Sequence, residues 1–273
     1  MRLNMHTRVL CRLAVILAAA VPLLAANAAP ALASPPSNDD ISNATAITSL
    51  PFNDIVDISQ ATFAPTDVSF CFGQAQSVWY QFTPATSGQV AFDSSLSNQP
   101  ISIDVFTGSP GALSFVGCGQ GGGGDTGGFI LNATGGTTYW IMASPICCIS
   151  VPTLNLWVYL AVPPHATLSV TGGSVDQAGN ATITGTLDCV GTVPEGVGIS
   201  GSVTQAVGRL SSVSGSFATS TTCASALGWK AFAQPNAGRF AGGPATVSIP
   251  TVFVCNIVGC ATPSTTAVIK LRG

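Results

Sequence analysis

The sequence predicts an all-β protein of two β-sandwich domains, of jelly-roll or Ig-like type, that follow a cleaved signal peptide. Two observations carry this prediction. Short segments of alternating apolar and polar residues recur with turn residues between them, and no 3.6-residue periodicity persists for three turns. A proline pair near the middle of the chain divides these segments into two sets of sandwich size.

The first set of segments predicts strands at residues 56–63, 77–83, 88–94, 101–107, 113–118, 128–133, 137–143 and 153–162. The second set predicts strands at residues 180–189, 198–206, 208–219, 228–233, 238–249, 252–255 and 265–272. Prolines cannot donate hydrogen bonds to a strand ladder, and the pair Pro163-Pro164 stiffens the connection between the sets. We therefore expect one sandwich over residues 34–162, a linker over 163–165 and a second sandwich over 166–273.

The N-terminus has the pattern of a secretory signal peptide over residues 1–33. Arg2, Arg8 and Arg12 precede an unbroken apolar run over residues 13–26, and small residues follow it. The run is too short to cross a bilayer of about 30 Å as a helix. We expect cleavage after Ala33, or alternatively after Ala28, and a secreted protein without a membrane span that is extracellular or loosely associated with the cell surface.

The cysteines that follow this signal are even in number, which in an exported chain indicates disulfides. A zinc site is disfavoured because His165 is the only histidine after the signal. The eight cysteines are Cys71, Cys118, Cys147, Cys148, Cys189, Cys223, Cys255 and Cys260. We expect Cys189 to pair with Cys223 and Cys255 with Cys260. The remaining four allow three pairings. A bond between the adjacent Cys147 and Cys148 would be strained, so pairings that join these two cysteines to Cys71 and Cys118 are favoured.

Charge is distributed unevenly between the two halves. Residues 34–162 hold eight aspartates and no Lys, Arg or His, which gives a formal net charge of −8. Residues 163–273 hold five Lys and Arg against three acids, which gives +2. Neither half carries the basic surface that nucleic-acid binding requires, so no nucleic-acid partner is expected.

The glycine-rich run over residues 117–128 contains a formal G-x-G-x-x-G match at Gly117, Gly119 and Gly122. A dinucleotide fingerprint of this kind places the pyrophosphate at the N-terminus of a following helix. Here the next segment, 128–133, is predicted to be a strand. We expect the run to be an inter-strand loop, and no cofactor is predicted.

Catalytic motifs are missing from the sequence. His165 stands on the predicted linker, and Glu195 is the only glutamate after the signal. No G-x-S-x-G elbow, H-E-x-x-H pair or pair of glutamates occurs. The sequence therefore predicts a protein that is not an enzyme.

Three tryptophans are candidates for a ligand platform. Alternation in residues 77–83 places Val78, Tyr80 and Phe82 on one strand face and Trp79 on the other. Trp140 and Trp157 occupy similar positions on two other predicted strands. If these faces are solvated, the rings could stack on a sugar or peptide; if other elements cover them, the rings are core, which is the favoured interpretation.

The N-terminal half resembles the bacterial pre-peptidase C-terminal domain family. The resemblance covers residues 38–162 and rests on the run 37–47 (SNDDISNATAI), on SVWYQFTPATSGQV, on DVFTGSPGALSFVGC and on GGTTYWIMA. It implies a non-catalytic β-sandwich module of a secreted protein. The C-terminal half is similar to an uncharacterised module of bacterial secreted proteins, which implies no activity.

Relatives in that family carry acidic residues where this chain has Ser97-Asn98-Gln99-Pro100 and Cys118-Gly119-Gln120-Gly121. Calcium requires six to eight oxygen ligands with carboxylates among them, so no metal site is predicted. Asp39, Asp40 and Asp104 are the best remaining ligand candidates. The resulting expectation is a secreted surface-binding or adhesion protein with an unknown extracellular polysaccharide or protein partner. The alternatives are a structural envelope protein without a discrete ligand and a secreted hydrolase of unrecognised type.

Overall fold

The computed structural model describes residues 34–65, 67, 70–72, 76–123, 125–146, 152–191, 196–223 and 225–273. The predicted signal peptide, Cys147, Cys148 and Glu195 lie outside the described residues. The described chain is almost entirely β, as predicted, with one 3₁₀ turn, η1 (Ile41–Asn43), and no α-helix among the described residues. None of the described helices is long and apolar enough to cross a membrane.

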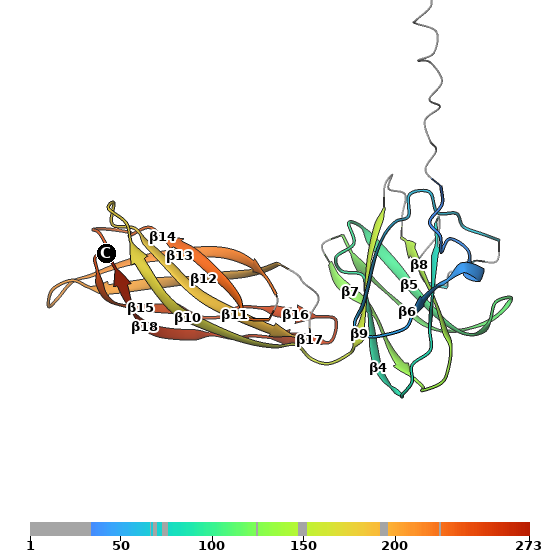
Figure 1. The fold of residues 1–273 in the computed structure, drawn as a ribbon. Helices are drawn as coiled ribbons and strands as arrows, with labels where there is room; N and C mark the ends of the chain where they lie inside the picture. The colour runs from blue at the N-terminus through green and yellow to red at the C-terminus, as the bar shows by residue number, and fades with distance from the viewer. Residues whose placement is uncertain are drawn as a thin grey trace, which may run out of the picture. The chain divides into compact units, whose positions relative to one another are not determined.

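The N-terminal nine-stranded sheet has the strand order β1-β3-β8-β5-β6-β7-β4-β9-β2. Its strands run from blue to yellow-green in Figure 1. They are β1 (Thr45–Ile47), β2 (Phe52–Asp57), β3 (Val78–Phe82), β4 (Gly88–Asp93), β5 (Pro100–Ser109), β6 (Ala112–Gly122), β7 (Asp125–Ala133), β8 (Tyr139–Pro145) and β9 (Thr153–Leu160). All neighbours pair antiparallel except β1 and β3, which are parallel.

One apolar core joins the two halves of this sheet. Val78, Tyr80 and Phe82 of β3 are buried in the same cluster as Phe92 of β4 and Leu156 of β9. Strands β3, β5 and β8 therefore face strands β4, β7 and β9 across the core, as in a sandwich. The alternation predicted for residues 77–83 is correct, because Val78, Tyr80 and Phe82 point into one core and Trp79 points away from it.

The C-terminal seven-stranded sheet has the order β13-β12-β15-β18-β10-β11-β14. Its strands, yellow to red in Figure 1, are β10 (His165–Val175), β11 (Ala181–Val190), β12 (Gly196–Ala206), β13 (Ser212–Thr222), β14 (Leu227–Ala233), β15 (Gly243–Ile249) and β18 (Thr265–Arg272). A small hairpin of β16 (Val254–Asn256) and β17 (Gly259–Ala261) precedes β18.

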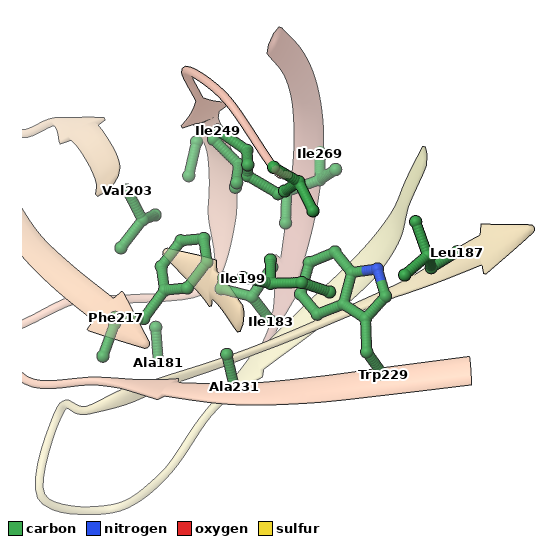
Figure 2. Close-up of a cluster of buried hydrophobic side chains, with 14 of the residues drawn as sticks. Ala181, Ile183, Leu187, Ile199, Val203, Phe217, Trp229, Ala231, Ile249 and Ile269 are labelled. Carbon is green, nitrogen blue, oxygen red and sulfur yellow. The ribbon is translucent and has the colours of Figure 1, made fainter. Parts of the chain in front are cut away.

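The core of this sheet follows simple period-2 alternation. Strand β11 alternates buried and half-buried residues from Ala181 to Cys189, which places Ile183 and Leu187 inside. Figure 2 shows Ile183 and Ile199 converging with the rings of Phe217 and Trp229 between the strands. These two rings are stacked, with centroids 6.3 Å apart and planes inclined by 17°.

The prediction that residues 117–128 form a loop is wrong. Strand β6 continues to Gly122 and β7 begins at Asp125, so most of the run belongs to two paired strands. A Cβ atom at Gly119 would lie 1.9 Å from the Gly128 carbonyl oxygen, and one at Gly121 would lie 2.1 Å from that of Gly127. Glycine is therefore needed because the two backbones approach too closely for any side chain. The run leads into a strand, whereas a dinucleotide fingerprint leads into a helix.

Strand β10 is a second difference from the sequence prediction, which places no strand between residues 162 and 180. His165, expected in the linker, is the first residue of β10. The first part of β10 alternates clearly, with Ala166, Leu168 and Val170 half-buried against the core and exposed residues between them, so the segment carries a strand signal that the prediction overlooked. After Val170, a β-bulge and two glycines interrupt the alternation.

Candidate functional site: an aromatic patch on the N-terminal sheet

The N-terminal sheet carries a second apolar layer on the face opposite its core. Trp79 of β3, Phe106 of β5 and Met142 of β8 are buried there in one cluster. Half-buried Phe63 and Trp140 pack against it, from the segment between β2 and β3 and from β8. We call these five residues the outer cluster, and we call the segment that contributes Phe63 the covering loop. The β3 and β8 strands are therefore apolar on both faces.

A buried carboxylate fixes the covering loop to β3. Asp67 is 6% exposed and accepts hydrogen bonds from Ser77 Oγ at 2.5 Å, Trp79 Nε1 at 3.2 Å and the Ala64 backbone N–H at 2.9 Å. Three donors compensate the loss of water around a buried carboxylate. The Trp79 ring is held in place by a polar contact at its edge as well as by packing.

The covering loop is fixed in two further ways. Asp104 of β5 is fully buried and accepts from the Phe70 backbone N–H at 3.2 Å and from Ser102 Oγ at 3.0 Å. Cys71, which follows Phe70 in the chain, forms a disulfide with Cys118 of β6, 47 residues later in the sequence. Phe70 and Phe72 therefore flank a residue that is covalently attached to the sheet.

These attachments present aromatic rings to solvent. Phe70 is 59% exposed and stacks on Phe115 of β6, which is 40% exposed, with ring centroids 4.7 Å apart. Both rings also contact buried Phe106, at 6.0 Å and 5.8 Å between centroids. Val116, the extra residue of a β-bulge opposite β5, is exposed beside Phe115. Together with exposed Phe72 next to Cys71, we call Phe70, Phe72, Phe115 and Val116 the aromatic patch.

The three tryptophans proposed as a ligand platform do not lie together. Trp79 is 0% exposed and cannot present its ring to a ligand. Trp140 packs in the same outer cluster and donates from Nε1 to the Gly108 carbonyl at 3.1 Å. Trp157 belongs to a separate small cluster with Ala91 and Tyr159, and its buried Nε1 has no hydrogen-bond partner among the described residues.

The aromatic patch was missed because its residues come from a loop and from one bulged strand that alternation does not relate. One feature of the sequence could have indicated the patch: the two phenylalanines in Phe70-Cys71-Phe72 flank a cysteine that is expected to form a disulfide. The proximity of Phe115 follows only from the Cys71–Cys118 bond.

The candidate metal ligands have other partners. Asp39 accepts from Thr62 Oγ1 at 2.9 Å, and Asp40 caps η1 by accepting from the Ser42 backbone N–H at 3.4 Å. In the described part of the chain, the group of three possible ligands that lie within 4.8 Å of one another is Cys71, Asp104 and Cys118. The two cysteines of this group are joined in a disulfide, so their sulfurs are not thiolate ligands.

Two further disulfides occur in the C-terminal half. Cys189 pairs with Cys223 and Cys255 with Cys260, with Cα atoms 5.6 Å and 4.0 Å apart. Both pairings agree with the sequence prediction. Cys71–Cys118 differs from it, because this bond belongs to the one pairing of the four remaining cysteines that does not join Cys71 and Cys118 to Cys147 and Cys148.

Two hydrogen-bonded pairs of an aspartate and a tyrosine, one buried and one part-buried, complete the polar chemistry of the N-terminal sheet. Asp93 accepts from Tyr159 Oη at 2.7 Å and from the Ser95 backbone N–H at 2.9 Å. Tyr80 Oη donates to Asp54 at 3.0 Å, and burial, together with the neighbouring Asp54 charge, raises the pKa of Tyr80 well above 10.0. His165 is exposed at the start of β10, and its ring forms no ion pair or hydrogen bond with another described residue.

Comparison with known proteins identifies no family. No family model matches the chain, and no curated protein matches it. Solved structures match its fold weakly: an FMN-binding β-glucuronidase from Facaelibacterium prausnitzii (10% identity, TM-score 0.25, 82% of this chain and 40% of that one). A β-glucuronidase from Bacteroides uniformis has 12% identity and a TM-score of 0.22, over 76% of this chain and 27% of that one. A β-glucosidase from Streptomyces venezuelae has 8% identity and a TM-score of 0.24, over 78% of this chain and 48% of that one. The chain spans less than half the length of these enzymes, and likeness at this level carries no argument about activity.

Proposed function

We propose that the protein is a secreted, non-catalytic surface-binding or adhesion protein that contacts a protein ligand through the aromatic patch. The observation that carries the proposal is the exposed, stacked pair Phe70 and Phe115, held at one place by Asp104 and by the Cys71–Cys118 disulfide. Exposed apolar patches of this kind are typical of interaction sites, and aromatic residues are enriched at the centres of interfaces.

The chemistry of the aromatic patch favours a protein over a polysaccharide. Sugar recognition requires directional polar groups around a stacking ring. Phe70, Phe115 and Val116 offer only apolar surface, which fits apolar side chains of another protein. The eight aspartates and absent cations of residues 34–162 further favour a partner with basic residues around its apolar contact.

The test uses protein from residue 34 onward, labelled with a fluorophore and added to cells of the producing organism from which the native gene has been deleted. Phe70→Ser combined with Phe115→Ser should lower retention on the cells by about tenfold or more, because aromatic residues at interface centres commonly contribute over about 1.4 kcal/mol. The matched control is Phe232→Ser combined with Phe253→Ser, which removes two phenylalanines of the C-terminal half that are 51% and 66% exposed.

Pretreatment of the cells separates the ligand classes. Protease should abolish retention of the wild-type protein, and polysaccharide hydrolases should leave it unchanged. Equal retention of the Phe70→Ser/Phe115→Ser variant and the wild type would contradict the proposal and would favour a structural envelope protein without a discrete ligand.

A further inference from the structure

Strand β2 is the last strand of the N-terminal sheet, and its outer edge is uncovered. It pairs with β9 from Phe52 to Asp57 without a bulge, and no other described strand runs alongside it. In an antiparallel pair, every second residue points its backbone N–H and C=O groups away from the partner strand. From that side, no hydrogen bond of the described chain reaches the backbone of residues 52–57. The outer edge of β2 therefore offers backbone donors and acceptors to another chain.

The burial of the side chains also indicates an open edge. Phe52 and Val56 pack against the core of the N-terminal sheet but are only half-buried. Leu154 and Leu156 of β9, the next strand of the sheet, are fully buried in the same core. On the opposite face of β2, Ile55 is 63% exposed. Because the side chains of a strand alternate between the two faces, an added strand would cover apolar surface on both faces of β2.

The other sheet edges are shorter or covered. Strand β1, at the far end of the N-terminal sheet, has three residues. The end strands of the C-terminal sheet, β13 and β14, lie beside each other. Just after β14, the Asn236 backbone N–H donates to the Ser214 carbonyl of β13 at 2.8 Å. Among the described strands, β2 is therefore the longer of the two open edges.

Charge at the β2 edge selects the kind of strand that can add to it. Asp57 is exposed, and one oxygen of half-buried Asp54 accepts from Tyr80 Oη at 3.0 Å. The other Asp54 oxygen has no hydrogen-bond partner among the described residues. Proteins often block an edge strand with lysine, proline or a bulge, and residues 52–57 contain none of these. The two carboxylates repel an acidic strand and attract a basic one.

A second copy of this chain is a poor occupant of the edge. Pairing of two β2 strands would bring together two domains that each have a formal net charge of −8 and contain no Lys, Arg or His. Their repulsion extends over about 8 to 10 Å at physiological salt, which is farther than the spacing of paired strands. Charge complementarity therefore favours a basic segment of a different protein.

We propose that the outer edge of β2 binds an extended, basic segment of a partner protein, which joins the N-terminal sheet as a further strand and places Lys or Arg side chains beside Asp54 and Asp57. Backbone hydrogen bonds supply most of the affinity, and the two carboxylates select basic sequences. This edge uses none of the residues of the aromatic patch, so the proposal holds whether or not the proposed function of that patch is correct.

Two variants alter the edge at exposed or half-buried positions. Ile55→Lys places a cation at the centre of the open edge. Val268→Lys is the matched control, because Val268 is 74% exposed on β18, which lies inside the C-terminal sheet. Both changes add one positive charge in place of an exposed β-branched residue. Asp54→Asn combined with Asp57→Asn removes the two carboxylates and keeps an oxygen that can accept from Tyr80 Oη.

The test adds eight-residue peptides to the protein from residue 34 onward, with Val at alternate positions and Lys, Asn or Asp at the others. Amide hydrogen exchange should slow at alternate residues of 52–57 with the Lys peptide. Affinity should be about tenfold higher for the Lys than for the Asp peptide, because one peptide gains two exposed ion pairs and the other is repelled. Asp54→Asn with Asp57→Asn should reduce this preference, and Ile55→Lys should abolish the slowed exchange while Val268→Lys leaves it unchanged.

A Lys peptide with methylated backbone amides separates strand addition from attraction by charge, because it keeps the side chains but cannot donate to β2. It should not slow exchange at residues 52–57. Equal slowing by the methylated peptide would overturn the proposal, as would unchanged exchange with all three peptides at millimolar concentration or equal affinity for the three. Slowed exchange that increases with protein concentration when no peptide is present would assign the edge to a second copy of the chain and would also overturn it.

Discussion

The two sheets of this protein use their outer faces differently. In the N-terminal sheet, Trp79 and Phe106 lie buried behind the strands that form the core, and the acids Asp67 and Asp104 are buried with them. In the C-terminal sheet, the outer face of the strands is rich in hydroxyl residues, such as the hydrogen-bonded pair Ser169 and Thr186, whose side-chain oxygens are 2.7 Å apart. The N-terminal sheet therefore carries a second buried layer on its outer face, whereas the outer face of the C-terminal sheet is polar.

The difference also concerns how the backbone is constrained. The covering loop on the N-terminal outer face is fixed by carboxylates and a disulfide that act on Phe70 and its neighbours. The C-terminal sheet has no buried aspartate or glutamate among its described residues. Its loops are held by buried neutral amides instead: Gln205 donates to the Ala241 carbonyl and accepts from the Ala241 backbone N–H, and Asn256 donates to the Gly191 carbonyl.

Replacing the central tryptophan of each half gives the largest expected effect. Trp79→Ala and Trp229→Ala should each lower the free energy of unfolding by about 3 to 5 kcal/mol, because each removes a nearly fully buried ring. Only Trp79→Ala should also reduce retention on cells, because it removes the donor to Asp67 and the support of Phe106. Urea unfolding and the cell-retention assay check the two parts; loss of retention with Trp229→Ala in folded protein would contradict the distinction.

Disulfide removal should have a somewhat smaller effect. Cys189→Ser with Cys223→Ser opens a bond between residues 34 apart, and the loop-entropy relation gives a loss of about 3 to 4 kcal/mol. Cys255→Ser with Cys260→Ser opens a bond between residues only 5 apart, for which the same relation gives about 2 kcal/mol. Urea unfolding of both double variants measures the difference. A larger loss for the shorter loop would show that contacts around the bond dominate over chain entropy.

Asp104→Asn should destabilise the N-terminal outer face locally. The amide keeps the size of the carboxylate but places a donor in a buried position that now faces donors from Phe70 and Ser102, at a cost of about 1 to 3 kcal/mol. Amide exchange at Phe70 should accelerate, while exchange in β11 stays unchanged. Unchanged exchange at Phe70 would show that Asp104 does not hold this part of the covering loop.

How far the sequence predicts this architecture depends on the chemistry of each element. The alternation in β3 is strong because large apolar residues fill the inward positions, and it places Val78, Tyr80 and Phe82 correctly. The glycine-rich strands β6 and β7 lack side chains to alternate, so they resemble a loop in sequence. The aromatic patch depends on which cysteine Cys71 meets, and contacts across 47 residues carry no local signal.

Tyr80→Phe should change the free energy of unfolding least, and the size of the change should depend on pH. Because the folded-state pKa of Tyr80 is raised above 10.0, neutral Tyr80 contributes stability below about pH 10 that is lost as the pH rises through the folded-state pKa. The wild-type unfolding free energy should therefore fall more steeply between about pH 9 and 11 than that of the variant. Urea unfolding at several pH values measures both slopes, and parallel slopes would contradict the assigned role of Tyr80.

Hydroxyl-radical footprinting of cell-bound protein tests the central claim most directly, because it reports which phenylalanines the ligand covers. In free protein, exposed Phe70, Phe72 and Phe115 should be oxidised, as should exposed Phe232 and Phe253 of the C-terminal half. On cells, we predict that oxidation of the three phenylalanines in the aromatic patch falls while that of Phe232 and Phe253 persists. Unchanged oxidation of Phe70 and Phe115 in retained protein would contradict binding through the aromatic patch.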